Sequence, residues 1–336
     1  MRIRVWIAML IATGAIAPLT GCGGSARSAS APDRPNRVQS ATLVLDFIPN
    51  AVHAGIYSAL AHGYDAQEGV RLHVIAPSAS TDSIKLLETG RAGFAILDIH
   101  DLAIARERGE DIVGIMAVVQ RPLAAVLTAP PITSPRELAA VGRTVGITGV
   151  PSDTAVLRSI VAGAGGDPGR LKTVTIGFNA VAALLAHRVA GATAFWNDEG
   201  VSLQRERPGF HVFRVDDYGA PSYPELVLCA SHASLQRDPQ RAHAVVRALT
   251  RGYGVTLSDP RRSEADLERE VPGLDPRLLT AELRALLPVF GAGKHSFGTL
   301  DLTRLRAWST WEARMGIVSR PPDVSRMFDP RFAAGT

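Results

Sequence analysis

LDFIPNAVH, residues 45–53, contains the end of one segment and the start of another, and it indicates an α/β fold. A candidate strand, residues 42–46, stops inside it. A candidate helix begins near residue 51 and runs to about 62, with apolar residues at every fourth position. Asn50 is a suitable N-cap for that helix. A strand followed directly by an amphipathic helix is the repeating unit of α/β domains with a largely parallel sheet.

The same alternation of short apolar segments and helical segments continues to Ser231. After Ser231 the pattern is helical only, with candidate helices around residues 242–253, 278–287 and 301–315. The expected strands are Thr42–Asp46, Val70–Ala76, Gly93–Leu97, Ile112–Val118, Ala124–Thr128, Thr144–Thr148, Thr173–Ile176, Ala192–Phe195, Phe210–Val215 and Leu226–Ala230.

A proline-rich break at residues 129–131 divides the strand-helix series into two. We expect the chain to cross there into a second lobe, residues 129–226, and to return near the apolar run that starts at residue 226. The first lobe would then comprise residues 41–128 and be completed by 227–336. Two extended crossings form a hinge that suits a protein that closes on a ligand.

The N-terminus has the pattern of an export signal. Basic residues precede an apolar run, residues 5–17, that is too short to span a bilayer. Leu19-Thr20-Gly21-Cys22 then resembles the lipobox of bacterial lipoproteins, which implies a signal peptide over 1–21 and acylation of Cys22. Residues 22–40 are rich in Gly, Ser, Ala and Pro and are expected to be a flexible tether. The alternative is an ordinary signal peptide with a chance cysteine.

Composition and motifs exclude several functions. The chain has 336 residues, of which 46% are hydrophobic and 20% charged, as in ordinary globular proteins. Its net charge of +4 is dispersed without a basic block, which argues against nucleic-acid binding. We find no phosphate-binding loop, nucleophile elbow or paired-histidine motif, so no catalytic residue, cofactor or metal is predicted. A triad assembled only in space remains an open alternative.

Two polar segments follow expected strands, where ligands bind in open α/β sheets. The first offers Asp46, Phe47, Asn50 and His53. The alternative interpretation is that its polar residues only cap the turn and its phenylalanine packs inward. The second segment is the turn at residues 149–154, between an expected strand and a helix, and it contains Ser152. Backbone N–H groups at the start of that helix could bind a ligand oxygen; the alternative is that Ser152 simply caps the helix.

A third segment offers Trp196, Asn197 and Glu199. A flat ring, an amide and a carboxylate suit a planar heteroaromatic ligand with exocyclic amines. The alternative is a packing tryptophan beside helix-capping residues.

These segments resemble the NMT1/THI5-like family of ABC-importer solute-binding proteins, which includes proteins for thiamine pyrimidine precursors. The matching pieces are residues 45–57, 90–96, 146–152 and 196–200. The resemblance implies a two-lobed periplasmic-binding-protein fold of type II, an α/β fold with the ligand cleft between the lobes. It implies ligand-binding roles for Asn50, His53, Asn197 and Glu199, for Phe47 where relatives commonly have Trp, and for Tyr223 in the segment PSYPE.

The resemblance further implies a non-enzymatic, lipid-anchored extracytoplasmic protein that acts as a monomer. Its partners would be a small heteroaromatic ligand such as a formyl- or hydroxymethyl-aminopyrimidine, an ABC permease with its ATPase, and the membrane through the anchor. Asp98 departs from the family pattern and adds a carboxylate to the expected site. Alternatives are a riboflavin, sulfonate or nitrate receptor, or a pyrimidine-synthesising enzyme using His53 and Glu199. The export signal and the lack of a Cys-rich motif disfavour the enzyme.

Overall fold

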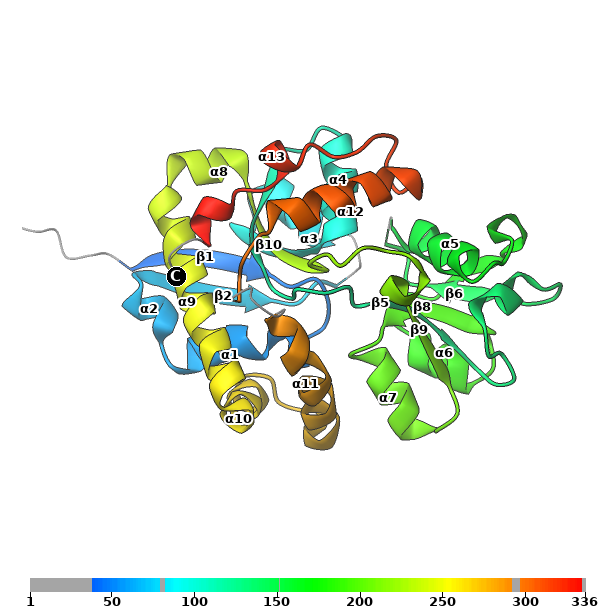
Figure 1. The fold of residues 1–336 in the computed structure, drawn as a ribbon. Coiled ribbons are helices and arrows are strands. Elements are labelled where there is room, and N and C mark those ends of the chain that lie inside the picture. Colours follow the sequence, from blue (N-terminus) through cyan, green and yellow to red (C-terminus); the bar gives the residue numbers. More distant parts are fainter. Residues whose placement is uncertain (1–37, 79–81, 151, 292–296, 334–336) are drawn as a thin grey trace, which may run out of the picture. The chain divides into compact units, whose positions relative to one another are not determined.

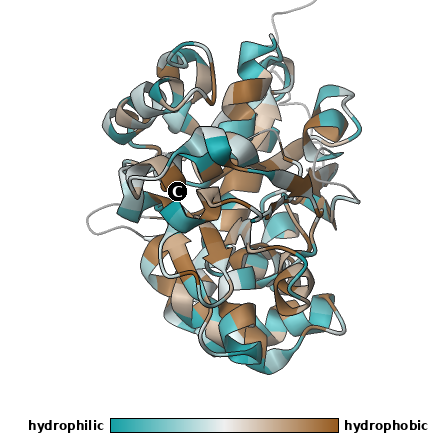
Figure 2. Cartoon of the chain, turned by 90° about the vertical axis from the view of Figure 1, so that its right-hand side faces the viewer, coloured by the Kyte–Doolittle hydropathy of each residue, from teal (hydrophilic) through white to brown (hydrophobic). Residues whose placement is uncertain are grey.

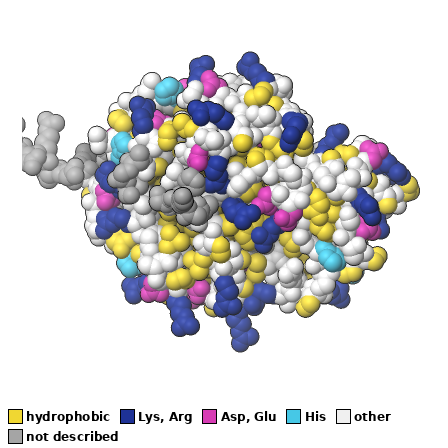
Figure 3. Space-filling view, in the orientation of Figure 1, with side chains coloured by type: hydrophobic (Ala, Val, Ile, Leu, Met, Phe, Trp, Pro, Cys, Tyr) yellow, Lys and Arg dark blue, Asp and Glu magenta, His cyan; other side chains and the backbone are white. Residues whose placement is uncertain are grey.

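The computed structural model describes residues 38–78, 82–150, 152–291 and 297–333. The expected leader, Cys22 and most of the expected tether lie outside the described residues. Among the described helices, none is both long and apolar enough to cross a membrane. On the face in Figure 3, Lys and Arg side chains are scattered rather than gathered in one patch.

The first sheet has the strand order β2-β1-β3-β10-β4. Strand β1 pairs in parallel with β2 and β3, whereas β10 is antiparallel to both β3 and β4. The bounds are β1 Gln39–Val44, β2 Val70–Ile75, β3 Phe94–Asp98, β4 Ile112–Ala117 and β10 Leu226–Ser231. Because β1 begins at Gln39, the ordered fold starts two residues before the expected end of the tether.

The second sheet repeats this arrangement with the order β7-β6-β8-β5-β9. Here β6 is parallel to β7 and β8, and β5 is antiparallel to β8 and β9. The bounds are β5 Ala124–Thr128, β6 Val145–Ile147, β7 Thr173–Thr175, β8 Gly191–Phe195 and β9 His211–Arg214. The antiparallel strand of each sheet is the first strand that the chain forms after it crosses from the other sheet: β5 in the second sheet and β10 in the first (Figure 1).

The two sheets with their helices are termed the first and second lobes. After the return crossing, helices Pro239–Ser258 and Pro260–Glu270 pack against helix Ala54–Ala61, and helix Pro276–Phe290 packs against Pro260–Glu270 (Figure 1). The helices are α1 Ala54–Ala61, α2 Tyr64–Gln67, α3 Asp82–Glu88, α4 Ile99–Glu107, α5 Asp153–Gly163, α6 Ala180–Leu185, α7 Glu199–Glu206, α8 His232–Arg237, α9 Pro239–Ser258, α10 Pro260–Glu270, α11 Pro276–Phe290, α12 Leu302–Arg314 and α13 Val324–Met327. Short 3-10 turns are η1 Ala51–His53, η2 Pro135–Ala139, η3 Pro168–Arg170, η4 Val215–Tyr218 and η5 Pro330–Phe332.

Hydrophobic residues lie on the strands and on the inward sides of the helices (Figure 2). One core cluster joins the first sheet to α1, α9 and α11, and a second continues from the first sheet and α12 to β5 and α5 of the second lobe. Helices α1 and α9 approach so closely that a Cβ on Gly252 would lie 2.0 Å from the Gly55 carbonyl oxygen, so the contact requires glycine at this position. Tyr253 on α9 donates from its hydroxyl to the Val52 carbonyl at 2.7 Å, which fixes the turn of the opening stretch.

The crossings differ from the sequence expectation. Strand β5 pairs with β8 and β9, so the chain crosses at residues 118–123, before β5, and not at the prolines after it. The proline pair instead ends β5 within the second lobe. The return crossing precedes residue 226, because β10 begins there and already belongs to the first sheet. The expected boundary at 128 was therefore displaced by the proline signal, which marks a turn rather than a linker.

Candidate functional site

A cavity lies between the two sheets, at the ends of strands from both lobes. The space between its lining atoms is about 850 Å³, a value that includes solvent at the open mouth. The described residues that line it are Asp46, Phe47, Ser83, Ile84, Ile96, Leu97, Asp98, Asp101, Ala124, Ala125, Thr148, Val150, Ser152, Asp153, Val156, Phe178, Thr193, Ala194, Phe195, Asp198 and Glu199.

Six of these lining side chains are acidic, and none is Lys, Arg or His. Three acids come from the first lobe (Asp46, Asp98, Asp101) and three from the second (Asp153, Asp198, Glu199). The site therefore offers hydrogen-bond acceptors and negative charge from both sides. An anionic ligand would find no cationic side chain among the described lining residues.

Burial keeps several of these acids protonated near neutral pH. It raises the pKa of Asp98 to about 8, and burial together with the Asp198 carboxylate raises the pKa of Glu199 to about 8. Burial also raises the pKa of Asp101 well above its ordinary value and that of Asp198 to about 6. A protonated carboxyl can donate through its hydroxyl and accept through its carbonyl oxygen, so the cavity can pair with a ligand that both donates and accepts.

Hydrogen bonds within residues 45–53 hold the Asp46 side chain at the cavity wall. His53 is fully buried; its Nε2 lies 2.9 Å from Asp46 Oδ1, and its Nδ1 accepts the Asn50 backbone N–H at 3.2 Å. Since Nδ1 is an acceptor, Nε2 carries the proton and donates it to Asp46. Asn50 and His53 lie behind the cavity wall and position Asp46, whereas Phe47 lines the cavity itself.

Aromatic rings from the two lobes meet at the cavity. The rings of Phe47 and Phe178 are 4.3 Å apart between centroids and inclined at 66°. Phe178 follows β7, so this pair joins the first lobe to the second. Such edge-to-face pairs contribute about 0.5–1.5 kcal/mol beyond the area they bury, and they supply flat surfaces for a planar ligand.

Trp196 and Asn197 lie outside the cavity wall. The indole Nε1 of Trp196 donates to the Pro122 carbonyl at 2.9 Å, and the Arg214 guanidinium carbon lies 3.9 Å from its ring centroid. Phe195, the preceding residue, faces the cavity instead. Asn197 is buried, and its side-chain oxygen has no hydrogen-bond partner among the described residues.

Ser152 and Asp153 form the second-lobe wall at the start of α5. Asp153 accepts from the Thr148 hydroxyl and the Gly149 backbone N–H, each at 2.7 Å, and from the Thr193 hydroxyl at 3.0 Å. These bonds connect the loop after β6 to β8. Asp101 of the first lobe accepts the Ser152 backbone N–H at 3.3 Å, so this wall also contacts the opposite lobe.

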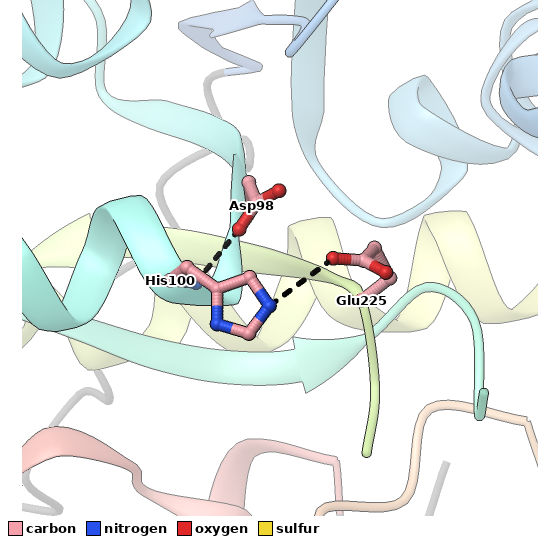
Figure 4. A group of neighbouring side chains, drawn as sticks. All are labelled: Asp98, His100 and Glu225. Atoms are coloured by element: carbon pink, nitrogen blue, oxygen red, sulfur yellow. Dashed lines mark hydrogen bonds and ion pairs between the residues drawn. The ribbon is translucent and has the colours of Figure 1, made fainter. Parts of the chain in front are cut away.

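Asp98, His100 and Glu225 are the group of described residues with ligand atoms close enough to hold a metal, within 4.8 Å of one another (Figure 4). Both ring nitrogens of His100 are already engaged, Nδ1 with Glu312 Oε2 at 2.7 Å and Nε2 with the Tyr223 hydroxyl at 2.9 Å. A metal would have to displace Tyr223. Burial alone would lower the pKa of His100, but Glu312 and the other carboxylates raise it to about 10, so a protonated imidazole balances them.

Glu225 links this buried group to both crossings. Its Oε2 accepts the backbone N–H groups of Leu123 and Ala124 at 2.5 and 2.8 Å, and its own carbonyl accepts from Ile99 at 2.9 Å. Glu225 precedes β10, and Leu123 precedes β5. Tyr223, predicted as a cleft residue, is fully buried in this hinge network rather than on the cavity.

Of the predicted site residues, the structure brings Asp46, Phe47, Asp98, Ser152 and Glu199 together on the cavity. Sequence reasoning missed Asp101, Asp153, Asp198 and Phe178. The three aspartates stand at or near the starts of helices, where an acid signals a cap as readily as a ligand contact. Phe178 follows a short exposed strand that gives no periodic signal.

Comparisons with known proteins agree with this arrangement. The model of the family described as NMT1/THI5 like matches residues 50–263. The formylaminopyrimidine-binding protein of Halalkalibacterium halodurans is 32% identical over 226 residues, covering 66% of this chain and 68% of that protein. The riboflavin-binding protein RibY of Chloroflexus aurantiacus is 27% identical, covering 100% of this chain and 99% of that protein.

Enzymes also occur among the relatives. The 4-amino-5-hydroxymethyl-2-methylpyrimidine phosphate synthase of Legionella pneumophila is 23% identical, covering 88% of this chain and 92% of that protein. Among solved structures, the periplasmic nitrate-binding protein NrtA of Synechocystis PCC 6803 has a TM-score of 0.71 at 11% identity, covering 88% of this chain and 87% of that chain. At that identity the likeness concerns the fold alone, which is the two-lobed fold of type II periplasmic binding proteins.

Proposed function

Because the chain belongs to the NMT1/THI5-like family, we propose that it is an extracytoplasmic solute-binding protein of an ABC importer that captures an aminopyrimidine precursor of thiamine. The ligand would bind in the cavity between the lobes and favour the closed state through contacts with both. The closed protein would deliver it to a permease driven by an ATPase.

The acidic lining is the observation that carries this proposal. An aminopyrimidine presents exocyclic amine donors beside ring-nitrogen acceptors. A carboxyl group matches that edge with two parallel hydrogen bonds, accepting from the amine and, when protonated, donating to the ring nitrogen. Glu199 and Asp98, whose pKa values are raised to about 8, are suited to this pairing. The Phe47–Phe178 pair would offer an aromatic surface to the ligand ring.

The same lining disfavours sulfonate and nitrate, although nitrate-binding NrtA shares the fold. Such anions require Arg, Lys or converging backbone N–H groups, and the described lining residues supply six acids and no cation. Riboflavin remains the second candidate, because the riboflavin-binding relative matches over its whole length.

Catalysis of pyrimidine synthesis finds little support at this site. The histidine that an enzyme would use, His53, is fully buried and held between Asp46 and the Asn50 backbone, behind the cavity wall. We propose a positioning role for it.

Isothermal titration calorimetry with formylaminopyrimidine, hydroxymethylpyrimidine, riboflavin, taurine and nitrate tests the proposal. Binding of an aminopyrimidine alone would support it. Binding of riboflavin alone would keep the import role and replace the ligand, whereas binding only of taurine or nitrate would contradict the argument from the acidic lining.

A further inference from the structure

Asp198 of the second lobe meets two side chains of the first lobe beside the cavity. The Asn50 side-chain amide donates to Asp198 Oδ2 at 2.7 Å. Glu282, on α11, forms a side-chain hydrogen bond with Asp198. Glu282 Oε2 also lies 3.4 Å from the Ala51 backbone nitrogen, which donates to it, so its position is fixed within the first lobe. Asp198 thus accepts from two first-lobe groups across the cleft.

A hydrogen bond between two carboxyl groups requires a proton on one of them. With both ionised, the two groups would repel each other in a buried setting, since Glu282 is 3% exposed and Asp198 lies on the cavity wall. The amide of Asn50 donates at any pH, but the Glu282 contact exists only while the proton is present.

We propose that Asp198 and Glu282 form a proton-dependent latch that holds the two lobes together, so that closure of the cleft takes up a proton at Glu282. The inference concerns closure itself and holds whichever ligand the cavity accepts.

The electrostatic surroundings place the proton on Glu282. Burial and the Asp198 carboxylate raise the pKa of Glu282 to about 9, whereas burial raises the pKa of Asp198 only to about 6 because His53 and the two donors oppose the increase. Opening the cleft exposes Glu282 to water and separates it from Asp198, so its pKa moves back toward the ordinary value. The closed state therefore binds more protons than the open state, and raising the pH favours opening.

Other charged groups face the latch and contribute to the pH response. Asp46 and His53 act on Asp198 from the first lobe, and Glu199 on α7 acts on Glu282. Glu264 on α10, which packs against α11, is engaged elsewhere, since it accepts from the Thr280 hydroxyl at 3.0 Å.

Buried acids elsewhere in the cleft add to this response. Asp101, which contacts Ser152 of the opposite lobe, and Asp98 also have raised pKa values. The latch is therefore tested as a difference between variants, not as the total pH dependence of closure.

Spin labels on the two lobes measure closure directly. Val141 in the second lobe and Leu257 in the first are 86% and 42% exposed, and the buried Cys229 does not react. We would label V141C/L257C in the full chain with Cys22→Ser and determine the ratio of closed to open populations by double electron–electron resonance between pH 6 and 8. The variants are Glu282→Gln and Asp198→Asn, which keep a hydrogen bond without the extra proton. Glu206→Gln, an exposed change on α7, is the matched control.

The closed-to-open ratio of the parent protein should fall as the pH rises, and Glu206→Gln should follow it. Uptake of one proton on closure changes the closed-to-open ratio by at most tenfold per pH unit. Either latch variant should therefore make the fall of this ratio less steep, by up to that factor. The proposal is overturned if the parent shows no pH response, or if both latch variants respond as the parent does. Loss of all aminopyrimidine binding with an intact pH response would instead contradict the proposed ligand and leave the latch standing.

Discussion

Replacing Glu225 with alanine should destabilise the protein by about 3–5 kcal/mol, the usual cost of removing one partner from a buried charged network. Three features of the structure produce this value. The carboxylate is fully buried, it accepts two backbone N–H groups from the first crossing, and its other oxygen lies 3.7 Å from His100 Nε2. Alanine would leave the Leu123 and Ala124 N–H groups without an acceptor, each costing about 1–3 kcal/mol, while water entering the space recovers part of the loss.

Differential scanning calorimetry measures this effect. About 300 ordered residues unfold with an entropy near 0.6 kcal/mol per kelvin, so a loss of about 3–5 kcal/mol lowers the Tm by about 5–8 °C. Glu225→Gln keeps a carbonyl oxygen for the two N–H groups and should lower the Tm less. Glu206→Ala, at an exposed position on α7, should leave the Tm within about 1 °C of the parent.

The opposite result would be an equal Tm for Glu225→Ala and Glu206→Ala. It would mean that the carboxylate does not hold the two crossings together, and that the backbone groups find other partners at no cost.

Three further predictions concern ligand, pH and membrane. Glu199→Ala should weaken aminopyrimidine binding by about 1–3 kcal/mol, or about 5- to 150-fold, because the two hydrogen bonds that the carboxyl makes to the ligand edge are lost; equal affinity in calorimetric titration would remove Glu199 from the site. The Tm should fall as the pH rises from 5 to 9, because the pKa values of Asp98 and Glu282 in the folded protein, about 8 and 9, lie above those in the unfolded chain. The stabilisation from these two protonated carboxyls is complete at low pH and is lost as the pH rises through the folded-state values. A Tm that rises over this range would contradict the raised pKa values. Cys22→Ser should move the protein from the membrane to the soluble fraction, and retention in membranes would exclude the lipid anchor.

Much of the fold follows from the sequence because strand and helix periodicities are local. All ten expected strands occur, most within two residues of their expected ends. The crossing before β5 was not predictable in the same way. Residues 118–123 contain a single proline, Pro122, whereas the proline pair after β5 carries a stronger turn signal, and only strand pairing shows which segment is the crossing.

The site was predictable only in part, for two physical reasons. Strand ends meet at one edge of a sheet, which is why Asp46 and Asp98 could be placed together on the first sheet and Glu199 at the corresponding edge of the second. Successive side chains along a strand point to opposite faces, however, and the sequence does not show which of the two faces the cavity. Phe195 and Trp196 are neighbours with opposite directions, and the sequence alone favoured the larger ring, whereas the structure turns Phe195 to the cavity and Trp196 to Pro122.

The acid-lined cleft should select an amine-bearing heteroaromatic ring over an anion. We would titrate the protein calorimetrically with formylaminopyrimidine and, separately, with the sulfonate taurine. We expect saturable binding of the aminopyrimidine in a one-to-one ratio and no heat from taurine. Tight binding of taurine with none of the aminopyrimidine would contradict this selectivity.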